Sequence, residues 1–205
     1  MLIDISPPLS EKSPVWPGDV AFSRRHQCRI DKGDNIDLSS VQTTVHIGAH
    51  ADAPSHYDSA GKTIDQVSIE PYIGPCQVVT VRTPVIKKKD LDFLDGALPK
   101  RLLIRTCSFD HQSKFDSSFS VFCPDAIRFC SSKGVNLIGI DTPSFDDFHS
   151  KSLPSHMALL ETGIRNLEGL DLCHVADGLY ELVALPLKLV GFDASPVRAI
   201  LRSLD

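Results

Sequence analysis

Short runs of aliphatic and β-branched residues recur along the chain. Because β-branched side chains pack well on a pleated surface, these runs predict short β-strands. The expected strands are residues 2–5, 76–83, 101–106, 136–140 and 180–189.

Two stretches are typical of short helices. Residues 124–133 begin with Pro124, which suits a first helical turn, and are followed by Gly134, a common stop signal. Residues 155–160 predict a second helix, with a proline before it and a glycine after it. A helix followed by the strand at 136–140 is the order of an α/β unit. We therefore expect an α/β fold that is β-rich with short helices.

The clearest alternation in the chain lies at residues 45–53. The odd positions carry only Val, Ile and Ala, which suits one packed face of an extended segment. The even positions before the proline carry His46, Gly48, His50 and Asp52. A face with so many titratable groups is costly to bury unless something binds it. A divalent metal ion is the obvious candidate.

The geometry of this segment has two alternatives. His46 and His50 have the i, i+4 spacing of two metal ligands on a helix, but Gly48 and Pro54 disfavour a helix there. In a straight strand, at about 3.3 Å per residue, the two histidines would stand roughly 13 Å apart, near the limit for sharing one ion. We therefore predict a bend or bulge at Gly48, where the missing side chain permits unusual dihedral angles.

Satisfied core or surface histidines are the plain alternative to a metal site. That interpretation suits a lone histidine better than this segment, because His56 follows closely after Pro54 and brings the titratable groups to four within eleven residues. Histidine and aspartate without cysteine suit zinc, manganese or a similar dication, and the spacing does not choose among them. A purely structural zinc site is less favoured, since such sites are usually closed and rich in cysteine.

Composition and charge narrow the class of protein. With 205 residues, 42% hydrophobic and 23% charged, the chain is typical of one globular domain spanning residues 1–205. The net charge of −5 argues against a nucleic-acid partner, and no apolar run is long enough to cross a membrane. The N-terminus lacks the features of a signal peptide, and the six cysteines form no CxxC pair. We expect reduced, mostly buried thiols in a cytoplasmic protein.

Four residues outside the alternating segment are weaker candidates on their own chemistry. Trp16, the only tryptophan, is held between prolines and suits either a core position or a pocket wall. A lone histidine such as His156 is usually structural, and a lone glutamate such as Glu168 is usually solvated. Asp141 ends an expected strand and could hold either a loop or a ligand histidine.

The run from His46 to His56 reads His-x-Gly-Ala-His-x-Asp-Ala-Pro-x-His. It resembles the signature of the metal-dependent cyclase family, and within it the branch of bacterial kynurenine formamidases (arylformamidases). Ala49 is typical of that branch, where other members of the family commonly have threonine. The resemblance extends along the whole chain, through residues 15–19, 140–144, 168–170, 185–188 and 195–199.

The resemblance implies a single-domain swivelling β/β/α-type fold and an oligomer, usually a homodimer. It also implies a small-molecule substrate, N-formyl-L-kynurenine, which is hydrolysed to L-kynurenine and formate in tryptophan catabolism by a metal-bridging hydroxide. A related hydrolase of the same family, acting on another amide, a lactam or a cyclic imide such as isatin, would share the metal site. The motif does not choose between these substrates.

The site residues carry over position by position. The residues that match His46, His50 and Asp52 hold one metal ion, typically zinc. Those that match Asp52, His156 and Glu168 hold the second, so that Asp52 and Glu168 bridge. The resemblance makes His56 the catalytic acid/base and Trp16 a residue of the substrate pocket. These implied roles agree with the imidazole pKa, which lies near the working pH, and with the flat apolar surface that an aromatic substrate needs.

Overall fold

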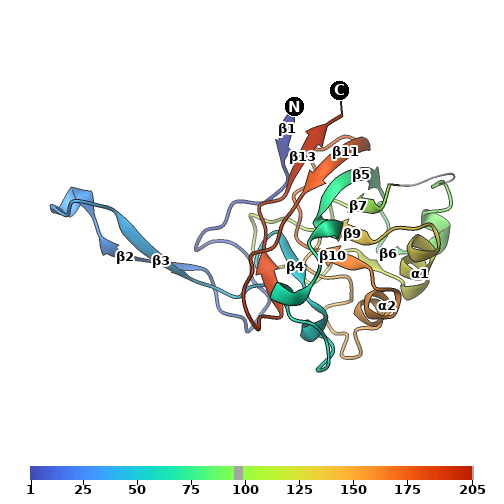
Figure 1. Ribbon diagram of the computed structural model, residues 1–205, viewed down its shortest axis with the longest axis horizontal. Helices are drawn as coiled ribbons and strands as arrows, with labels where there is room; N and C mark the ends of the chain where they lie inside the picture. The colour runs from blue at the N-terminus through green and yellow to red at the C-terminus, as the bar shows by residue number, and fades with distance from the viewer. Residues whose placement is uncertain (95–98, 205) are drawn as a thin grey trace.

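A seven-stranded mixed sheet runs through the protein, seen in a computed structural model that describes residues 1–94 and 99–204 (Figure 1). In spatial order its strands are β1 (Leu2–Asp4), β13 (Ile200–Ser203), β11 (Gly178–Val183), β5 (Ile73–Thr80), β7 (Arg101–Arg105), β9 (Leu137–Ile140) and β10 (Arg165–Leu167). The strands from β5 to β10 run parallel to one another, whereas β11, β13 and β1 each run antiparallel to their neighbours. The sheet therefore joins a parallel half to an antiparallel half.

The five predicted strands are all present, although their ends differ. The run at 180–189 is a strand only as far as Val183, and Pro186 beyond it has no N–H to donate to a neighbouring strand. Two sheet strands are absent from the predicted set. One of them, β10, is only three residues long and contains Arg165 and Asn166, which are not typical of a strand.

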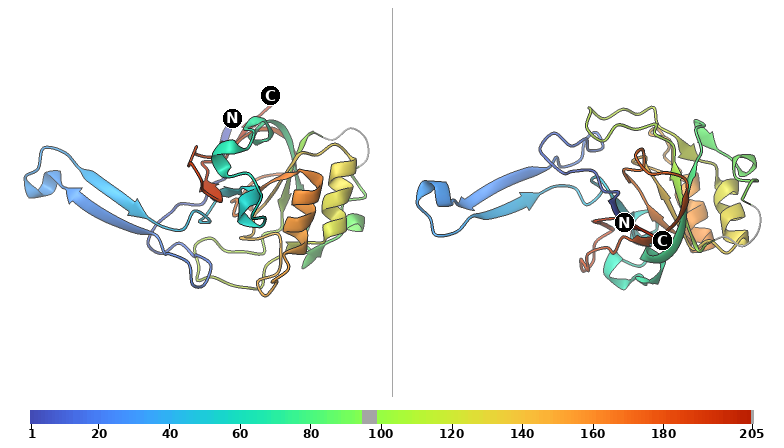
Figure 2. Two further views of the ribbon diagram at one scale, coloured as in Figure 1. Left: turned by 60° about the horizontal axis from the view of Figure 1, so that its bottom comes forward. Right: turned by 90° about the horizontal axis from the view of Figure 1, so that it is seen from above.

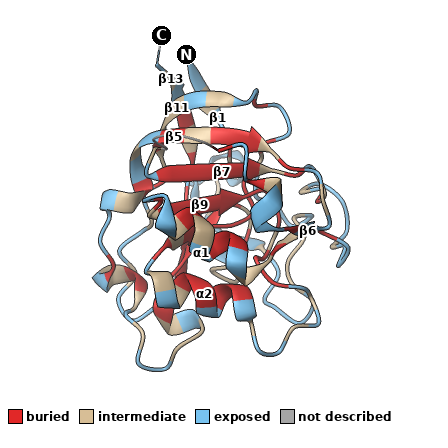
Figure 3. Cartoon of the chain, turned by 90° about the vertical axis from the view of Figure 1, so that its right-hand side faces the viewer, coloured by how far each residue is buried: buried red, intermediate tan, exposed pale blue. Residues whose placement is uncertain are grey.

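Two nine-residue helices, α1 (Pro124–Ser132) and α2 (Pro154–Thr162), cover one face of the sheet (Figure 3). Leu102 and Ile104 of β7 are buried in the cluster that contains these helices. Leu103, which lies between them, is buried in a second cluster on the other face. Burial on both faces explains why β7 and β9 contain continuous apolar runs. The prediction of a β-rich α/β fold with short helices is confirmed.

A short ribbon packs on the face opposite the helices. It consists of β4 (His50–Asp52) and β12 (Ala194–Pro196), which pair antiparallel. The three alanines of the segment 45–53 are buried in the same cluster as Leu103, as the alternation predicts. Gly48 has φ of +54°, in the left-handed region that favours glycine, so the predicted bend is confirmed.

A long hairpin projects from the rest of the chain (Figures 1 and 2). It is formed by β2 (Ser23–Cys28) and β3 (Leu38–Gln42), and we call residues 23–42 the arm. Every residue of β3 and nearly all of β2 are exposed. A strand with solvent on both faces has no apolar and polar alternation, so its sequence carries little strand signal.

Shorter elements complete the described structure. Two brief strands, β6 (Val85–Ile86) and β8 (Val121–Phe122), pair in parallel near the helices. The 3₁₀ helices are η1 (Ile30–Lys32), η2 (Pro54–His56), η3 (Ile64–Gln66), η4 (Glu70–Tyr72) and η5 (Lys88–Asp90). Of these, η2 continues directly from β4 and carries His56, so the whole predicted motif lies in one short stretch of structure.

The cysteines differ from the prediction. Cys107 and Cys173 form a disulfide, with their Cα atoms 5.5 Å apart, whereas Cys76 and Cys130 are free and buried. The expectation of six reduced thiols is therefore wrong for one pair, because cysteines separated by 66 residues with no spacing motif give no sign of pairing. The cysteine pattern no longer supports a reducing compartment, and the cytoplasmic location stays a prediction. Among the helices that the structure describes, none is long and apolar enough to cross a membrane.

Candidate metal centre

Strand β4 presents two of the predicted ligands on one face. His50 and Asp52 are both buried, at 2% and 1% exposure, while Ala51 between them faces the core. The backbone of His50 pairs with that of Glu168: each N–H donates to the other's carbonyl, at 3.1 and 3.0 Å. The two segments can approach this closely only because residue 169 is glycine. Its φ is +63°, and a Cβ there would stand 2.1 Å from the carbonyl oxygen of Gly48. This pairing brings Glu168 beside the ligand strand.

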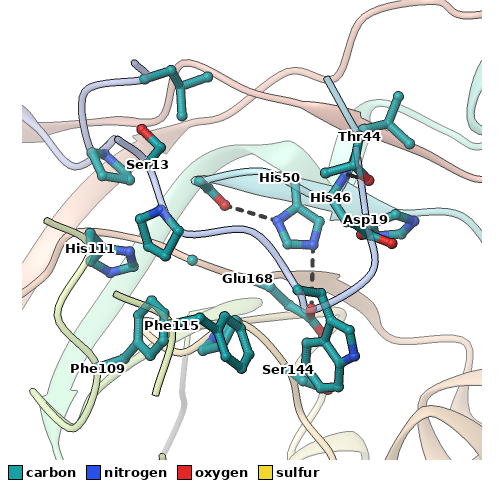
Figure 4. Close-up of a pocket in the computed structure, with 18 of the residues that line it drawn as sticks. Ser13, Asp19, Thr44, His46, His50, Phe109, His111, Phe115, Ser144 and Glu168 are labelled. Carbon is teal, nitrogen blue, oxygen red and sulfur yellow. Dashed lines mark hydrogen bonds and ion pairs between the residues drawn. The ribbon is translucent and has the colours of Figure 1, made fainter. Parts of the chain in front are cut away.

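The five predicted ligands meet in one cluster. Asp52 Oδ1 lies 3.0 Å from His46 Nδ1 and 3.6 Å from His50 Nε2, and Asp52 Oδ2 lies 3.6 Å from His156 Nε2. Glu168 completes the cluster, with Oε1 3.2 Å from His156 Nε2 and Oε2 3.4 Å from His50 Nε2 (Figure 4). Each carboxylate therefore faces at least two imidazole nitrogens.

A cation would satisfy atoms that the protein leaves without partners. Within the described residues, His50 Nε2 and Asp52 Oδ1 are buried and have no hydrogen-bond partner. His50 Nδ1 donates to the carbonyl of Gly48 at 2.9 Å, so its Nε2 lone pair is directed at the carboxylates of Asp52 and Glu168. Acceptors facing one another in a buried site are unfavourable unless a cation lies between them. The donor set of imidazole nitrogens and carboxylate oxygens fits zinc or a similar dication.

Within this cluster, two groups of three residues have ligand atoms close enough to share an ion. One consists of His50, Asp52 and Glu168, and the other of His46, Asp52 and His56, each with its atoms within 4.8 Å of one another. Asp52 belongs to both groups, whereas His156 belongs to neither, and the bridging role of Asp52 stays a prediction. His56 belongs to the second group, so it is placed where it could ligate an ion as well as act as an acid/base beside the cluster. The division of ligands between two ions stays a prediction.

Three further residues make hydrogen bonds to side chains of the cluster. Asp146 accepts from His156 Nδ1 at 2.7 Å, and its carboxylate also accepts the backbone N–H groups of Ser155 and His156 at the start of α2. The Asn166 amide donates to Asp52 Oδ2 at 2.7 Å and to Glu168 at 3.2 Å. Such partners orient metal ligands.

The third supporting residue is Asp193, just before β12. Its Oδ2 accepts from His46 Nε2 at 2.8 Å and lies 3.4 Å from His56 Nδ1. No sequence pattern predicts the supporting role of any of the three. Asn166 alone has a local signal, because it precedes Glu168 by two positions in an extended segment and so shares its face.

Asp141 holds a loop and does not touch a predicted ligand. Its carboxylate accepts from the backbone N–H groups of Thr106 and Cys107, both at 2.8 Å, and from the Thr106 hydroxyl at 2.6 Å. Burial raises the pKa of Asp141 above its usual value. Of the two roles that the sequence allows for Asp141, the structure selects the loop, and Asp146 orients the histidine.

The imidazoles of the cluster differ in basicity. Burial lowers the pKa of His46, but the hydrogen bond to Asp193 and the nearby carboxylate of Asp52 outweigh burial and raise that pKa to about 10. Burial also lowers the pKa of His156, but the hydrogen bond to Asp146 and the nearby carboxylates of Asp52 and Glu168 outweigh it, so the pKa of His156 lies well above its ordinary value. For His56 burial prevails and lowers the pKa. His56 is therefore a neutral base at pH 7.

The cluster opens into a cavity of about 470 Å³. Trp16, Phe109 and Phe115 line it together with His46, His50, His56, His156 and Glu168. Figure 4 shows Phe109 and Phe115 on one side of the cavity, with His50 directed at Glu168 on another. The ring of Trp16 packs against Phe148 and Phe115, with centroids 4.8 and 5.3 Å apart. Trp16 is thus a supported wall residue, half-buried and facing the cavity.

The comparisons with known proteins agree with this geometry. The sequence model of a family described as "Putative cyclase" matches residues 3–147. A kynurenine formamidase from Bordetella pertussis is 43% identical, over 99% of this chain and 98% of its own. Another from Polaromonas naphthalenivorans is 45% identical, over 98% and 91%.

Solved structures show the same fold. A protein described as a potential metal-dependent hydrolase with cyclase activity superposes with a TM-score of 0.84 at 30% identity, over 98% of this chain and 96% of its own. Isatin hydrolase A from Labrenzia aggregata, bound to benzyl benzoate, has a TM-score of 0.79 at 21% identity, over 98% and 93%. At that identity it supports the fold alone. The chain therefore belongs to the cyclase family and is an enzyme of the hydrolase class.

Proposed function

We propose that the protein hydrolyses N-formyl-L-kynurenine to L-kynurenine and formate. The observation that carries this proposal is the buried cluster of histidines and carboxylates, which opens into a cavity with an aromatic wall. The relatives named kynurenine formamidase support the choice of substrate, since they match nearly the whole chain at 43% and 45% identity.

We propose that the cluster holds two zinc ions. His46, His50 and Asp52 would ligate one, and Asp52, His156 and Glu168 the other. Asp52 belongs to both sets, and the two oxygens of Glu168 face His50 and His156, one ligand from each set. When bound, such ions lower the pKa of a water molecule and polarise a carbonyl group, which a formamide needs because it is a weak electrophile. The buried carboxylates and the partnerless His50 Nε2 support this assignment.

His56 is the proposed acid/base. Its lowered pKa keeps the imidazole neutral at pH 7, so it can accept the proton of the attacking water. Because Nδ1 faces Asp193, Nε2 is the nitrogen that exchanges protons. The same proton returns to the departing aniline nitrogen as the C–N bond breaks, which gives formate and the free amine.

The aromatic wall is the proposed binding surface for the substrate's benzene ring. Trp16 offers a flat apolar face, and Phe115 and Phe148 hold its ring in place. Packing a ring against this wall also excludes water from the cluster. The cavity is large enough for one small aromatic molecule.

We propose a homodimer in which the arm contacts a second copy. An isolated two-stranded hairpin is marginally stable in water, and the arm has no core of its own. It also exposes apolar side chains, including Ile30 at 59%, Leu38 at 48% and Val41 at 61%. A second copy of the chain would bury them on both arms at once, as two-fold symmetry requires.

A substrate panel tests the proposed activity. Zinc-loaded protein is given N-formyl-L-kynurenine, isatin and a cyclic imide, while formate and ring-opened products are quantified and elemental analysis counts the bound metal. We expect formate release from N-formyl-L-kynurenine to exceed turnover of the other two, with up to two dications per chain. Preferential opening of isatin or the imide would overturn the proposed substrate.

A further inference from the structure

Asp193 contacts two imidazoles that have different proposed roles. Its Oδ2 accepts from His46 Nε2 at 2.8 Å and stands 3.4 Å from His56 Nδ1. The two rings lie close together, with centroids 4.1 Å apart and planes tilted by 37°. We propose that Asp193 is a positioning residue, which fixes the orientation of both the ligand His46 and the acid/base His56. The inference rests on the proposed function.

The backbone places Asp193 at this point. It directly precedes β12, whose Ala194 pairs with Asp52 in β4. Its own carbonyl accepts the N–H of Ala53 at 2.8 Å, and Ala53 is the residue that leads into η2 and so to His56. The ribbon of β4 and β12 therefore sets Asp193 opposite the point where the ligand strand ends and the turn with His56 begins.

The contact with His46 selects which nitrogen faces the cluster. Because Nε2 donates to Asp193, Nδ1 is the nitrogen that lies 3.0 Å from Asp52 Oδ1. An imidazole ring can flip about its last torsion, and a carboxylate bound to one nitrogen holds the ring and its tautomer. Without Asp193, nothing else among the described residues accepts from His46 Nε2.

The contact with His56 acts in the same way on the proposed acid/base. The His56 side chain is 34% exposed, so packing alone restrains it less than it restrains the buried ligands. A carboxylate beside Nδ1 favours the tautomer that carries its proton there, which leaves Nε2 as a proton acceptor. The same oxygen thus links the geometry of the metal ligand to that of the base.

Asp193 differs from the other two supporting residues. Asp146 and Asn166 are buried, at 3% and 1% exposure, and each contacts predicted metal ligands but not His56. The Asp193 side chain is 46% exposed. Replacing it therefore leaves no buried cavity, and Asp193→Asn keeps its shape while removing its charge.

The experiment compares Asp193→Asn with Asp177→Asn. Asp177 is a matched control, since its side chain is 50% exposed and pairs with Arg105, away from the cavity. For both variants we would measure thermal stability, the zinc dissociation constant, and kcat and KM on N-formyl-L-kynurenine at saturating zinc. We expect Asp193→Asn to weaken zinc binding by about 10–100-fold and, when saturated, to lower kcat by about tenfold or more with little change in KM. Asp177→Asn should match the parent protein in zinc affinity, kcat and KM, and its lost contacts with Arg105 and Thr80 should affect thermal stability alone.

A double variant separates positioning from a general loss of structure. If Asp193 acts through His56, adding Asp193→Asn to His56→Ala should lower kcat by less than about threefold, because the partner is already gone. An equal fall in kcat in both backgrounds would overturn the inference, as would full kcat in zinc-saturated Asp193→Asn. If the parent protein does not hydrolyse N-formyl-L-kynurenine, the proposed function fails, but the zinc affinity of Asp193→Asn still tests the contact with His46.

Discussion

At the scale of single residues, the burial of charge dominates the site. Asp52 and Glu168 are almost inaccessible to solvent, and three imidazoles surround them. Burial by itself raises the pKa of Asp52, yet the nearby imidazoles of His156 and His46 hold that pKa well below its usual value. The carboxylates are therefore ionised, and protons on His46 and His156 balance their charge until a metal replaces them.

Metal binding should accordingly depend on pH. The raised pKa values of His46 and His156 mean that both carry a proton at pH 7 in the metal-free protein, and each must lose it to become a ligand. Protons therefore compete with the metal for these nitrogens. Metal affinity should rise with pH through the neutral range, and the contribution of His46 should continue to rise toward its pKa of about 10. Calorimetry in buffers of different ionisation enthalpy should count about two protons released on loading both ions. A zinc affinity that is the same at about pH 6 and pH 8 would contradict this charge balance.

His56→Ala tests whether that residue is a base or a ligand. If His56 is the acid/base, the variant keeps its metal while kcat falls by about 10²–10⁴, the usual contribution of a positioned proton acceptor. Elemental analysis and steady-state kinetics on the same sample decide the question. Loss of metal would show that the group formed by His46, Asp52 and His56 binds an ion. Retention of both metal and rate would place the base elsewhere.

At the scale of elements, three loops and one ribbon assemble the cavity. One of the loops lies between β7 and β8 and contributes Phe109 and Phe115. The ribbon of β4 and β12 carries His50, Asp52 and, just before β12, Asp193. The N-terminal loop contributes Trp16, whose ring contacts Phe148 in the loop that also carries Asp146. The loop with Asp146 and Phe148 therefore both orients His156 and supports Trp16 in the wall of the cavity.

Trp16→Ala should mainly raise KM. Stacking on a substrate ring is made in the ground state and in the transition state alike, so its loss weakens binding without slowing the chemical step. Phe148→Ala is the companion variant, because Phe148 contacts Trp16 without lining the cavity. It should raise KM by a smaller factor. A fall in melting temperature for Trp16→Ala with unchanged KM would identify the tryptophan as a core residue instead.

At the scale of the whole molecule, the arm is the feature that a single chain leaves unexplained. It extends far from the sheet and the helices (Figure 2), and its residues contribute nothing to either hydrophobic cluster. Exposed apolar side chains on a projecting hairpin support the proposed contact with a second copy.

Disruption of the arm should change the oligomeric state. Leu38→Glu with Val41→Glu introduces two charges into β3, and we expect a dimer by sedimentation for the parent protein and monomers for the variant. Leu187→Glu with Val190→Glu is the matched control, because these residues are of the same two types and more exposed, at 59% and 79%, but lie outside the arm. Dissociation of the control alone would place the interface elsewhere.

Much of the protein follows from local sequence. The period of two at residues 45–53 predicts that the alanines pack in the core, as they do, because an extended chain must alternate its faces. That His46, His50 and Asp52 bind a metal stays a prediction. Pro124 and Gly134 predict α1 closely, since they act on the backbone within one turn. The ligand set was predicted through the resemblance of the whole motif to a family, and each of its members lies in the cluster.

Only the tertiary structure decided which distant residues support that set. Asp146, Asn166 and Asp193 reach the cluster through the start of α2, through β10 and through the pairing of β12 with β4. No periodic pattern in the sequence predicts these contacts, and none predicts the disulfide between Cys107 and Cys173. Local patterns record how a segment meets solvent and core, whereas contacts between segments far apart in sequence are set by how the whole chain packs.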